Sequence, residues 1–276
     1  MVHPGRLVYN PAMHRFQRHP DDWTIARLQP PHGRPRVVID TDAANEIDDQ
    51  FALAWALLSP QQMQVEAVYA TPFSFAHRRG QMVQARRARD QPEAASAEDN
   101  ELLALYASKI AHFERQGWPL ESADLPPFNP PGAGMERSFD EIVRVFELLG
   151  LAHAGRVFRG STGYLRDLHS PLRSPAAEHL VALALATPED QPLYVLAIGC
   201  LTNVASALLM APAIAERIVV VWTAGFPSHA PHVNRAFNLE QDLLASQLVF
   251  DCGVPLVYLP GYHVGAQLRL DRKSVV

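Results

Sequence analysis

Five carboxylate side chains crowd into the ten residues Asp40–Asp49, directly after the short apolar run Val37–Ile39, with no Lys or Arg among them. A helix dipole would favour one or two of them at roughly 0.3–1 kcal/mol each, which does not account for five. Oxygen-only ligands favour a hard cation such as calcium, whereas zinc would recruit His or Cys. The segment therefore predicts a cation site, the alternative being a solvated acidic turn in which Asp48 caps the next helix.

Strand-sized apolar runs alternate with helical patterns downstream of Arg36, and this alternation would position the acidic segment. The expected strands are Val37–Ile39, Val65–Tyr69, Val157–Arg159, Leu193–Ile198, Ile218–Trp222 and Val254–Leu259. The expected helices are 51–57, Phe139–Leu149, Ala176–Ala186, Asn203–Met210 and Glu240–Phe250. This order favours an α/β fold with a doubly wound, mostly parallel sheet. In such sheets ligands bind beyond the carboxyl ends of the strands, where the acidic segment lies.

Two segments depart from the alternation. Residues 1–35 contain several prolines and predict an irregular N-terminal arm, so the α/β domain would run from 36 to 276. Residues 76–133 predict a helical insertion with one helix, Glu101–Arg115, and a solvated arginine run, Arg78–Arg89. Five apolar residues of that helix lie at helical spacing and predict a packing face. They are Leu102, Leu105, Tyr106, Ile110 and Phe113.

Local signals mark helix ends. Ser138 with Glu141 forms a capping box, Gly150 a C-terminal stop, and Pro175 suits a first helical turn.

Composition limits the class of protein. The 276 residues are 48% hydrophobic with a net charge of −5, which predicts a sizeable core and disfavours a nucleic-acid partner. The apolar runs are too short to span a membrane, and 1–35 lack the apolar stretch of a secretion signal. Cys200 and Cys252 lie in apolar stretches that suit reduced thiols, so we expect a cytoplasmic protein with a small-molecule partner.

Three segments in order resemble the inosine-uridine-preferring nucleoside hydrolase family. Val38–Asp42 followed by Asp48-Asp49 matches the family's strand, Asp-x-Asp and Asp-Asp pattern, with a spacer two residues longer. Ala197–Ala205 is similar to its strand, Gly-x-Leu-Thr-Asn turn and helix, and Phe237-Asn238 with Asp242 to its Phe-Asn-x-x-x-Asp segment. The similarity extends from about Arg36 to Gln267, apart from the insertion, and implies a nucleoside hydrolase-like fold.

The resemblance implies a calcium-dependent enzyme that hydrolyses the N-glycosidic bond of ribonucleosides to ribose and free base. Asp42, Asp49 and the backbone carbonyl of Ile198 would hold Ca²⁺, and Asp42 would also be the general base for a calcium-bound water. Asp48 would bind a ribose hydroxyl, and Asn238 would bind the sugar unless it caps or bridges backbone. The partner would be a nucleoside, and a homo-oligomer is left open.

The chain departs from the family pattern at several positions. Ala236 stands where a sugar-binding Glu is usual and Ser74 where an Asn often follows the second strand, with Asn129 as a candidate replacement. The family's late His-Asp pair, whose Asp completes the calcium site, has no counterpart before Val276. The sequence therefore predicts a carboxyl-terminally truncated member with weakened calcium binding. Asp40 would support the site without binding the metal.

Ordinary structural roles are expected for the remaining polar residues. Thr202-Asn203 predicts a turn and helix cap, and Asp242 a helix cap. His229, His232 and His263 lie in loops and predict exposed or merely hydrogen-bonded side chains.

Two other functions stay open. One is a catalytically silent protein that binds nucleosides or sugars. The other is a magnesium-dependent phosphohydrolase with Asp40 as nucleophile and Asp42 as acid, against which the Ala43-Ala44 pair and the second acidic pair argue.

Overall fold

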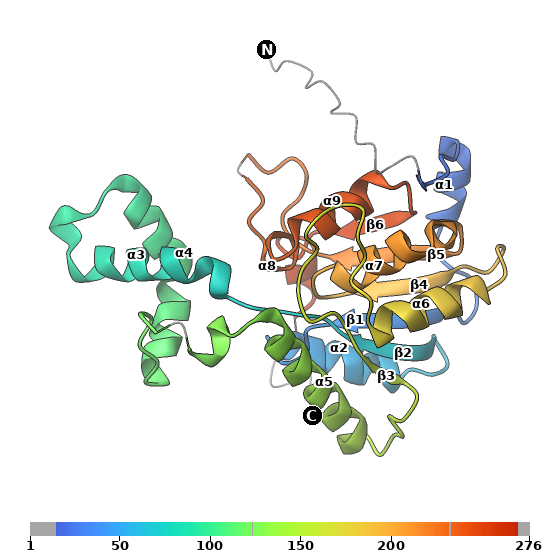
Figure 1. The fold of residues 1–276 in the computed structure, drawn as a ribbon, viewed down its shortest axis with the longest axis horizontal. Coiled ribbons are helices and arrows are strands. Elements are labelled where there is room, and N and C mark those ends of the chain that lie inside the picture. The colour runs from blue at the N-terminus through green and yellow to red at the C-terminus, as the bar shows by residue number, and fades with distance from the viewer. Residues whose placement is uncertain (1–14, 123, 232, 270–276) are drawn as a thin grey trace, which may run out of the picture.

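A single parallel sheet forms the centre of the computed structural model, which describes residues 15–122, 124–231 and 233–269 (Figure 1). Its strand order is β3-β2-β1-β4-β5-β6, and all neighbouring pairs are parallel. The strands are β1 (Arg36–Thr41), β2 (Gln64–Ala70), β3 (Val157–Arg159), β4 (Leu193–Ala197), β5 (Ile218–Thr223) and β6 (Leu256–Leu259). The predicted doubly wound α/β fold is confirmed, and its strand order reverses between β1 and β4.

Helices cover both faces of the sheet (Figure 1). On one face α2 (Ile47–Leu57) and α5 (Pro131–Leu148) pack on β1 and β2 through an apolar cluster that includes Leu53 and Phe146. On the other face α6 (Pro175–Leu185), α7 (Thr202–Met210) and α9 (Leu243–Asp251) enclose the larger cluster around Trp222. Burial on both faces explains why the strands read as continuous apolar runs.

The insertion forms a helical lobe beside the sheet, at the left of Figure 1. It contains α3 (Arg79–Asp90) and α4 (Ala97–Arg115), which pack through their own apolar cluster. The prediction of one helix was wrong, because the arginine run is itself helical and buries Met82, Ala85 and Ala88. On α4 the predicted packing face is buried except for Leu105, which is 55% exposed.

Other boundaries also differ from prediction. Helix α5 begins at Pro131 rather than Phe139, so Ser138 lies buried inside the helix and caps nothing. Asp48 likewise lies inside α2, whose N-cap is Glu46. The arm expected to be irregular contains α1 (Asp21–Arg27). Pro175 does occupy the first turn of α6, as predicted.

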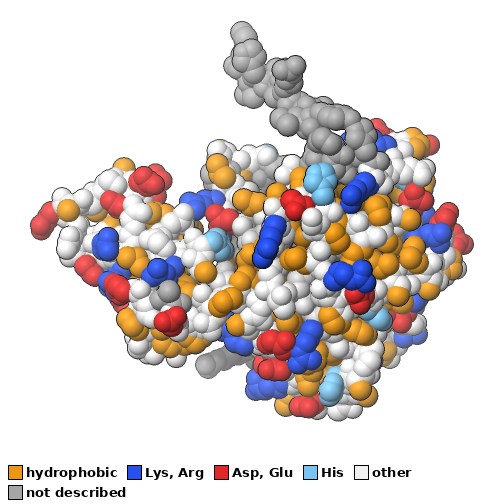
Figure 2. All heavy atoms as spheres, in the orientation of Figure 1, with side chains coloured by type: hydrophobic (Ala, Val, Ile, Leu, Met, Phe, Trp, Pro, Cys, Tyr) orange, Lys and Arg blue, Asp and Glu red, His pale blue; other side chains and the backbone are white. Residues whose placement is uncertain are grey.

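The remaining helical elements are short. They are α8 (Phe237–Glu240) and the 3-10 turns η2 (Ala76–Arg78), η3 (Pro92–Ala94), η4 (Pro126–Phe128), η5 (Pro212–Glu216) and η6 (Gly265–Gln267). Among the described residues, none of the helices has both the length and the apolar character needed to cross a membrane. Charged side chains of both signs are interspersed over the face shown in Figure 2.

Gly80→Ala should stabilise the fold. Gly80 lies in α3, and a Cβ there would meet no atom within 4 Å. Alanine is favoured over glycine inside helices by about 1 kcal/mol, so the urea midpoint should rise. Gly134→Ala in α5 should lower that midpoint, because its Cβ would lie 2.1 Å from the carbonyl oxygen of Phe73. Equal shifts in the two variants would contradict this account.

Candidate functional site

A cavity of about 430 Å³ lies where the strand order reverses, beyond the carboxyl ends of β1 and β4. This is the position at which doubly wound sheets bind ligands. The wall nearest the sheet contains residues of the acidic segment and of the end of β4, namely Asp42, Asn45, Glu46, Asp48, Asp49 and Ile198. Other lining residues come from around η2, from the lobe and from α8, and include Phe75, Arg78, Met82, Leu105, Tyr106, Lys109, Phe237 and Asn238.

Asp42 and Asp49 are the buried acids of this cavity, with 1% and 6% of their surfaces exposed. Burial raises the pKa of Asp42 to about 7, with further contributions from the negative charges of Glu46 and Asp48. Oδ2 of Asp42 has no hydrogen-bond partner in the part of the chain that the structure describes. Burial and the charge of Asp42 also raise the pKa of Asp49, although Thr41 donates to its Oδ1 at 2.6 Å. Burial and neighbouring negative charges therefore both disfavour the ionised forms of these two carboxyl groups.

The other predicted site residues reach the same cavity. Asp48 is exposed in the first turn of α2. The carbonyl oxygen of Ile198 accepts a hydrogen bond from Nδ2 of Asn238 at 2.7 Å, and this amide also donates to the carbonyl of Thr223 at 3.2 Å. Asn238 therefore bridges backbone, as the alternative interpretation expected, while still lining the cavity. The fold thus brings Asp42, Asp48, Asp49, Ile198 and Asn238 together.

Asp40 lies behind this cavity and does not line it. The residue is fully buried, and burial raises the pKa of its carboxyl group to about 8 despite a hydrogen bond from Asn203. Its backbone oxygen accepts from the N–H of Ile198 at 2.8 Å. This bond holds the end of β1 against the end of β4, next to the cavity.

The oxygen atoms of the cavity suit a hard cation. Asp42, Asp49 and the Ile198 carbonyl offer oxygen donors only, and the unpartnered, buried Oδ2 of Asp42 needs a positive neighbour. Within residues 15–122, 124–231 and 233–269, no group of three or more His, Cys, Asp or Glu side chains is arranged to hold a metal ion. Any cation here would therefore depend on two carboxylates and a backbone carbonyl.

Three polar residues have partners that sequence reasoning missed. Asn203 was expected to form a turn or cap, but its buried side chain bonds to Asp40, Ala70 and Ser161. Asp242 caps α9 as predicted, and also accepts from Oγ1 of Thr202 at 2.7 Å. No signal in the sequence indicated these contacts, because the partners lie far away along the chain.

The part of the cavity lining that the lobe supplies was also missed, since Asn129 was the one residue of the insertion expected at the site. The rings of Phe75 and Phe237 stack at 4.3 Å between the start of the lobe and α8. Arg78 pairs with Glu240 at 2.6 Å across the same boundary. Lys109 of α4 lies 3.4 Å from Glu46 in the acidic segment. Aromatic and ionic contacts therefore join the lobe to the acidic side of the cavity.

Other candidate residues lie elsewhere. Asn129 is not among the lining residues, and its carbonyl accepts from Oγ of Ser74, so the geometry does not support its expected sugar contact. His229 and His263 are exposed, as predicted, while His232 lies outside the described residues.

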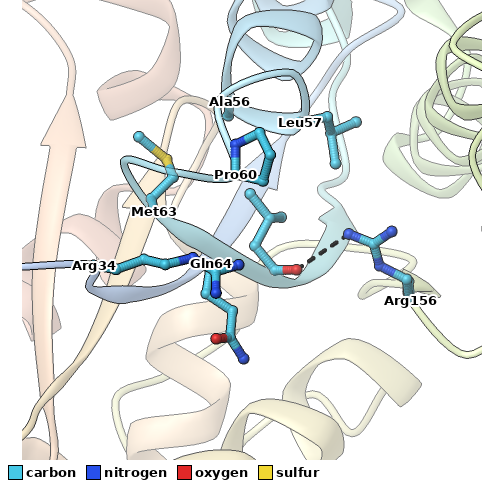
Figure 3. A pocket seen from close by; sticks show the side chains of 8 residues that line it. Arg34, Ala56, Leu57, Pro60, Met63, Gln64 and Arg156 are labelled. Atoms are coloured by element: carbon cyan, nitrogen blue, oxygen red, sulfur yellow. Dashed lines mark hydrogen bonds between the residues drawn. The ribbon is translucent and has the colours of Figure 1, made fainter.

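A second, smaller cavity of about 90 Å³ lies near the amino-terminal ends of β1 and β2 (Figure 3). Arg156, which donates to the carbonyl of Val65 at 3.2 Å, forms one side of it. No predicted site residue lines this cavity.

Several solved structures resemble this fold. They include the inosine-uridine preferring nucleoside hydrolase from Bacillus anthracis, with 19% identity over 87% of this chain and 68% of that one and a TM-score of 0.47. The purine-preferring ribonucleoside hydrolase from Gardnerella vaginalis has 17% identity over 82% and 60%, with a TM-score of 0.49. The type III effector XopQ, solved with adenosine diphosphate ribose, has 17% identity over 92% and 64%, with a TM-score of 0.41.

The chain spans only 60% to 68% of the lengths of these three proteins, and the likeness concerns the fold alone. No curated protein sequence matches the chain. The sequence profile described as inosine-uridine preferring nucleoside hydrolase matches residues 123–275, which is more than half of the chain. The chain therefore belongs to the inosine-uridine preferring nucleoside hydrolase family, a family of N-glycosidic hydrolases.

Proposed function

We propose that this chain hydrolyses the N-glycosidic bond of ribonucleosides to ribose and free base. The observation that supports the proposal most is the convergence of Asp42, Asp48, Asp49 and the Ile198 carbonyl on one cavity. These groups come from β1, α2 and the end of β4, and they meet where parallel sheets bind ligands.

The lining of the cavity combines polar and apolar groups, as a nucleoside does. The acids and the Asn238 amide would form hydrogen bonds with ribose hydroxyls. Phe75, Met82, Tyr106 and Phe237 offer apolar and aromatic surface to a flat base. A volume of about 430 Å³ is in the range of small-molecule sites.

In the proposed reaction a water attacks the anomeric carbon as the bond from that carbon to the base nitrogen breaks. Asp42 takes one proton from the water, and the departing base takes up the bonding electrons and a proton from solvent; Asp42 then returns its proton to solvent. The Asp42 carboxylate lines the cavity, and its Oδ2 has no hydrogen-bond partner among the described residues, so this oxygen can accept the proton. The carboxylates of Asp42, Asp48 and Asp49 would stabilise the positive charge that develops on the sugar ring.

We propose calcium as the cation, held by Asp42, Asp49 and the Ile198 carbonyl. When bound, the ion would lower the pKa of a nearby water and offset the negative charge of the buried acids. Asp48 and Asn238 would orient the ribose. The buried, unpaired thiols of Cys200 and Cys252 support a cytoplasmic setting for the reaction.

Reducing-sugar release from inosine and uridine tests the proposal. We expect release with added calcium, and loss of release after chelation with EDTA that is reversed by excess calcium. Binding of either nucleoside without sugar release would contradict hydrolysis and support the catalytically silent binding protein. If neither binding nor release occurs, the proposal fails.

The phosphohydrolase alternative gains no support from the geometry. Asp40, its expected nucleophile, is fully buried behind the cavity, and Nδ2 of Asn203 donates to its Oδ1 at 2.9 Å. p-Nitrophenyl phosphate with magnesium therefore serves as a negative control in the same assay.

A further inference from the structure

Asn203, in the first turn of α7, joins the ends of three strands. Its Nδ2 donates to Oδ1 of Asp40 at 2.9 Å and to the carbonyl of Ala70 at 3.1 Å. Its Oδ1 accepts from the N–H of Ser161 at 2.8 Å. Asp40 and Ala70 lie at the ends of β1 and β2, and Ser161 follows β3. Because Asn203 is fully buried, water does not compete for these bonds.

Asp40 connects Asn203 to the candidate site. Its backbone oxygen accepts from the N–H of Ile198, and Asp42 follows two residues later in the chain. The Asp42 carboxylate and the Ile198 carbonyl both line the cavity. A displacement of Asp40 would therefore change the spacing between these two oxygen donors.

The close fit around Asn203 depends on a glycine. A Cβ on Gly160 would lie 2.5 Å from Nδ2 of Asn203 and 2.0 Å from the carbonyl oxygen of Ala70. Any larger residue would push the segment after β3 away from the amide. Asn203 itself does not line the cavity, so it does not reach the substrate.

We propose that Asn203 is a positioning residue for the acidic site: through Asp40 it fixes the spacing between Asp42 and the Ile198 carbonyl. This inference rests on the proposed hydrolase function for its kinetic readout only. A purely structural role would lower the fraction of folded protein and leave kcat per folded molecule unchanged. A positioning role lowers kcat itself, because small displacements of reacting groups can cost about 100-fold in rate.

Asn203→Asp in the full chain tests the role in catalysis, because it keeps the size of the side chain but removes the amide that donates to Asp40 and to the Ala70 carbonyl. We expect kcat on inosine, per folded molecule, to fall by about 100-fold with little change in KM. Thr202→Val is the matched control, since Thr202 is equally buried in the same turn and bonds to Asp242 rather than to Asp40. It should lower stability more than it lowers kcat.

A charge exchange tests the pairing. The double variant Asn203→Asp with Asp40→Asn again places one carboxylate against one amide, and it should recover folding and part of the lost kcat. Recovery will be partial because the Ala70 carbonyl loses its donor. If Asn203→Asp alone does not fold, recovery of the fold in the double variant still supports the pairing, and no recovery contradicts it.

Hydrogen exchange gives a readout independent of activity. In Asn203→Ala, the amides of Ser161 and Ile198 should exchange faster than in wild type, while Thr202→Val should leave them protected. Unchanged protection of Ile198 would overturn the inference even if the wild type hydrolyses nucleosides. If the wild type does not hydrolyse nucleosides, the proposed function is contradicted. The exchange rates would still show whether Asn203 holds the backbone at Ile198.

Discussion

Asp42→Asn should greatly slow nucleoside hydrolysis and, without calcium, make the fold more stable. The carboxylate is 1% exposed, and its Oδ2 has no hydrogen-bond partner among the described residues, so ionisation in the folded chain is costly. The neutral amide removes that cost and keeps the size of the side chain. The same change removes the general base and a proposed metal ligand, which should lower kcat by roughly 10²–10⁴-fold.

Thermal unfolding with and without calcium separates the two effects. Calcium at 100 times its dissociation constant should stabilise the wild type by about 2.7 kcal/mol, and Asp42→Asn should lose most of this gain. Asp242→Asn is the matched control: it is another buried acid, but Leu165, Thr202 and Ala245 donate to its oxygens. It should be destabilised by about 1–3 kcal/mol. An Asp42→Asn variant that is equally destabilised, or still active, would contradict the assignment.

The sheet could be predicted because both of its faces are buried. Each strand is then a short apolar run, and the helical segments between the runs imply parallel order. The order of β1 and β4, which places Asp42 beside Ile198, could not be derived from those runs alone. The family resemblance implied that adjacency. In the structure β1 pairs with β4, and the N–H of Ile198 donates to the backbone oxygen of Asp40.

The lobe shows where local patterns failed. Helix α3 buries only Met82, Ala85 and Ala88, so its arginines concealed the helical period. Leu105 fits the apolar period of α4, yet it faces the cavity instead of the lobe core. Periodicity predicts that a face is covered, but it does not identify what covers it.

The predicted start of α5 was wrong for a different reason. The Ser138–Glu141 pattern has the spacing of a capping box, but Pro131 provides an earlier start with a fixed φ angle. Gly134 then lets the first turns approach Phe73, a contact between residues far apart in the chain. Asn203 likewise bonds to residues far away in the chain, Asp40 and Ala70, whereas its residue type and position predicted only a local turn.

Gly160→Ala should have the largest effect on stability of any single methyl addition near the site. The new Cβ would lie 2.0 Å from the Ala70 carbonyl oxygen and within 2.7 Å of both side-chain polar atoms of Asn203. These neighbours are backbone and a fully bonded buried amide, so neither can move without breaking hydrogen bonds. Overpacking of this kind costs about 1–3 kcal/mol, and each broken buried bond adds about 1 kcal/mol.

Gly163→Ala is the matched control, because it lies three residues later in the same segment and its Cβ would meet nothing within 4 Å. Its urea midpoint should stay close to that of the wild type, while that of Gly160→Ala falls sharply. Because the methyl group displaces Asn203 from Asp40, Gly160→Ala should also lower kcat per folded molecule. If Gly160→Ala matched Gly163→Ala in both stability and kcat, the strand ends would not be held as tightly as these contacts require.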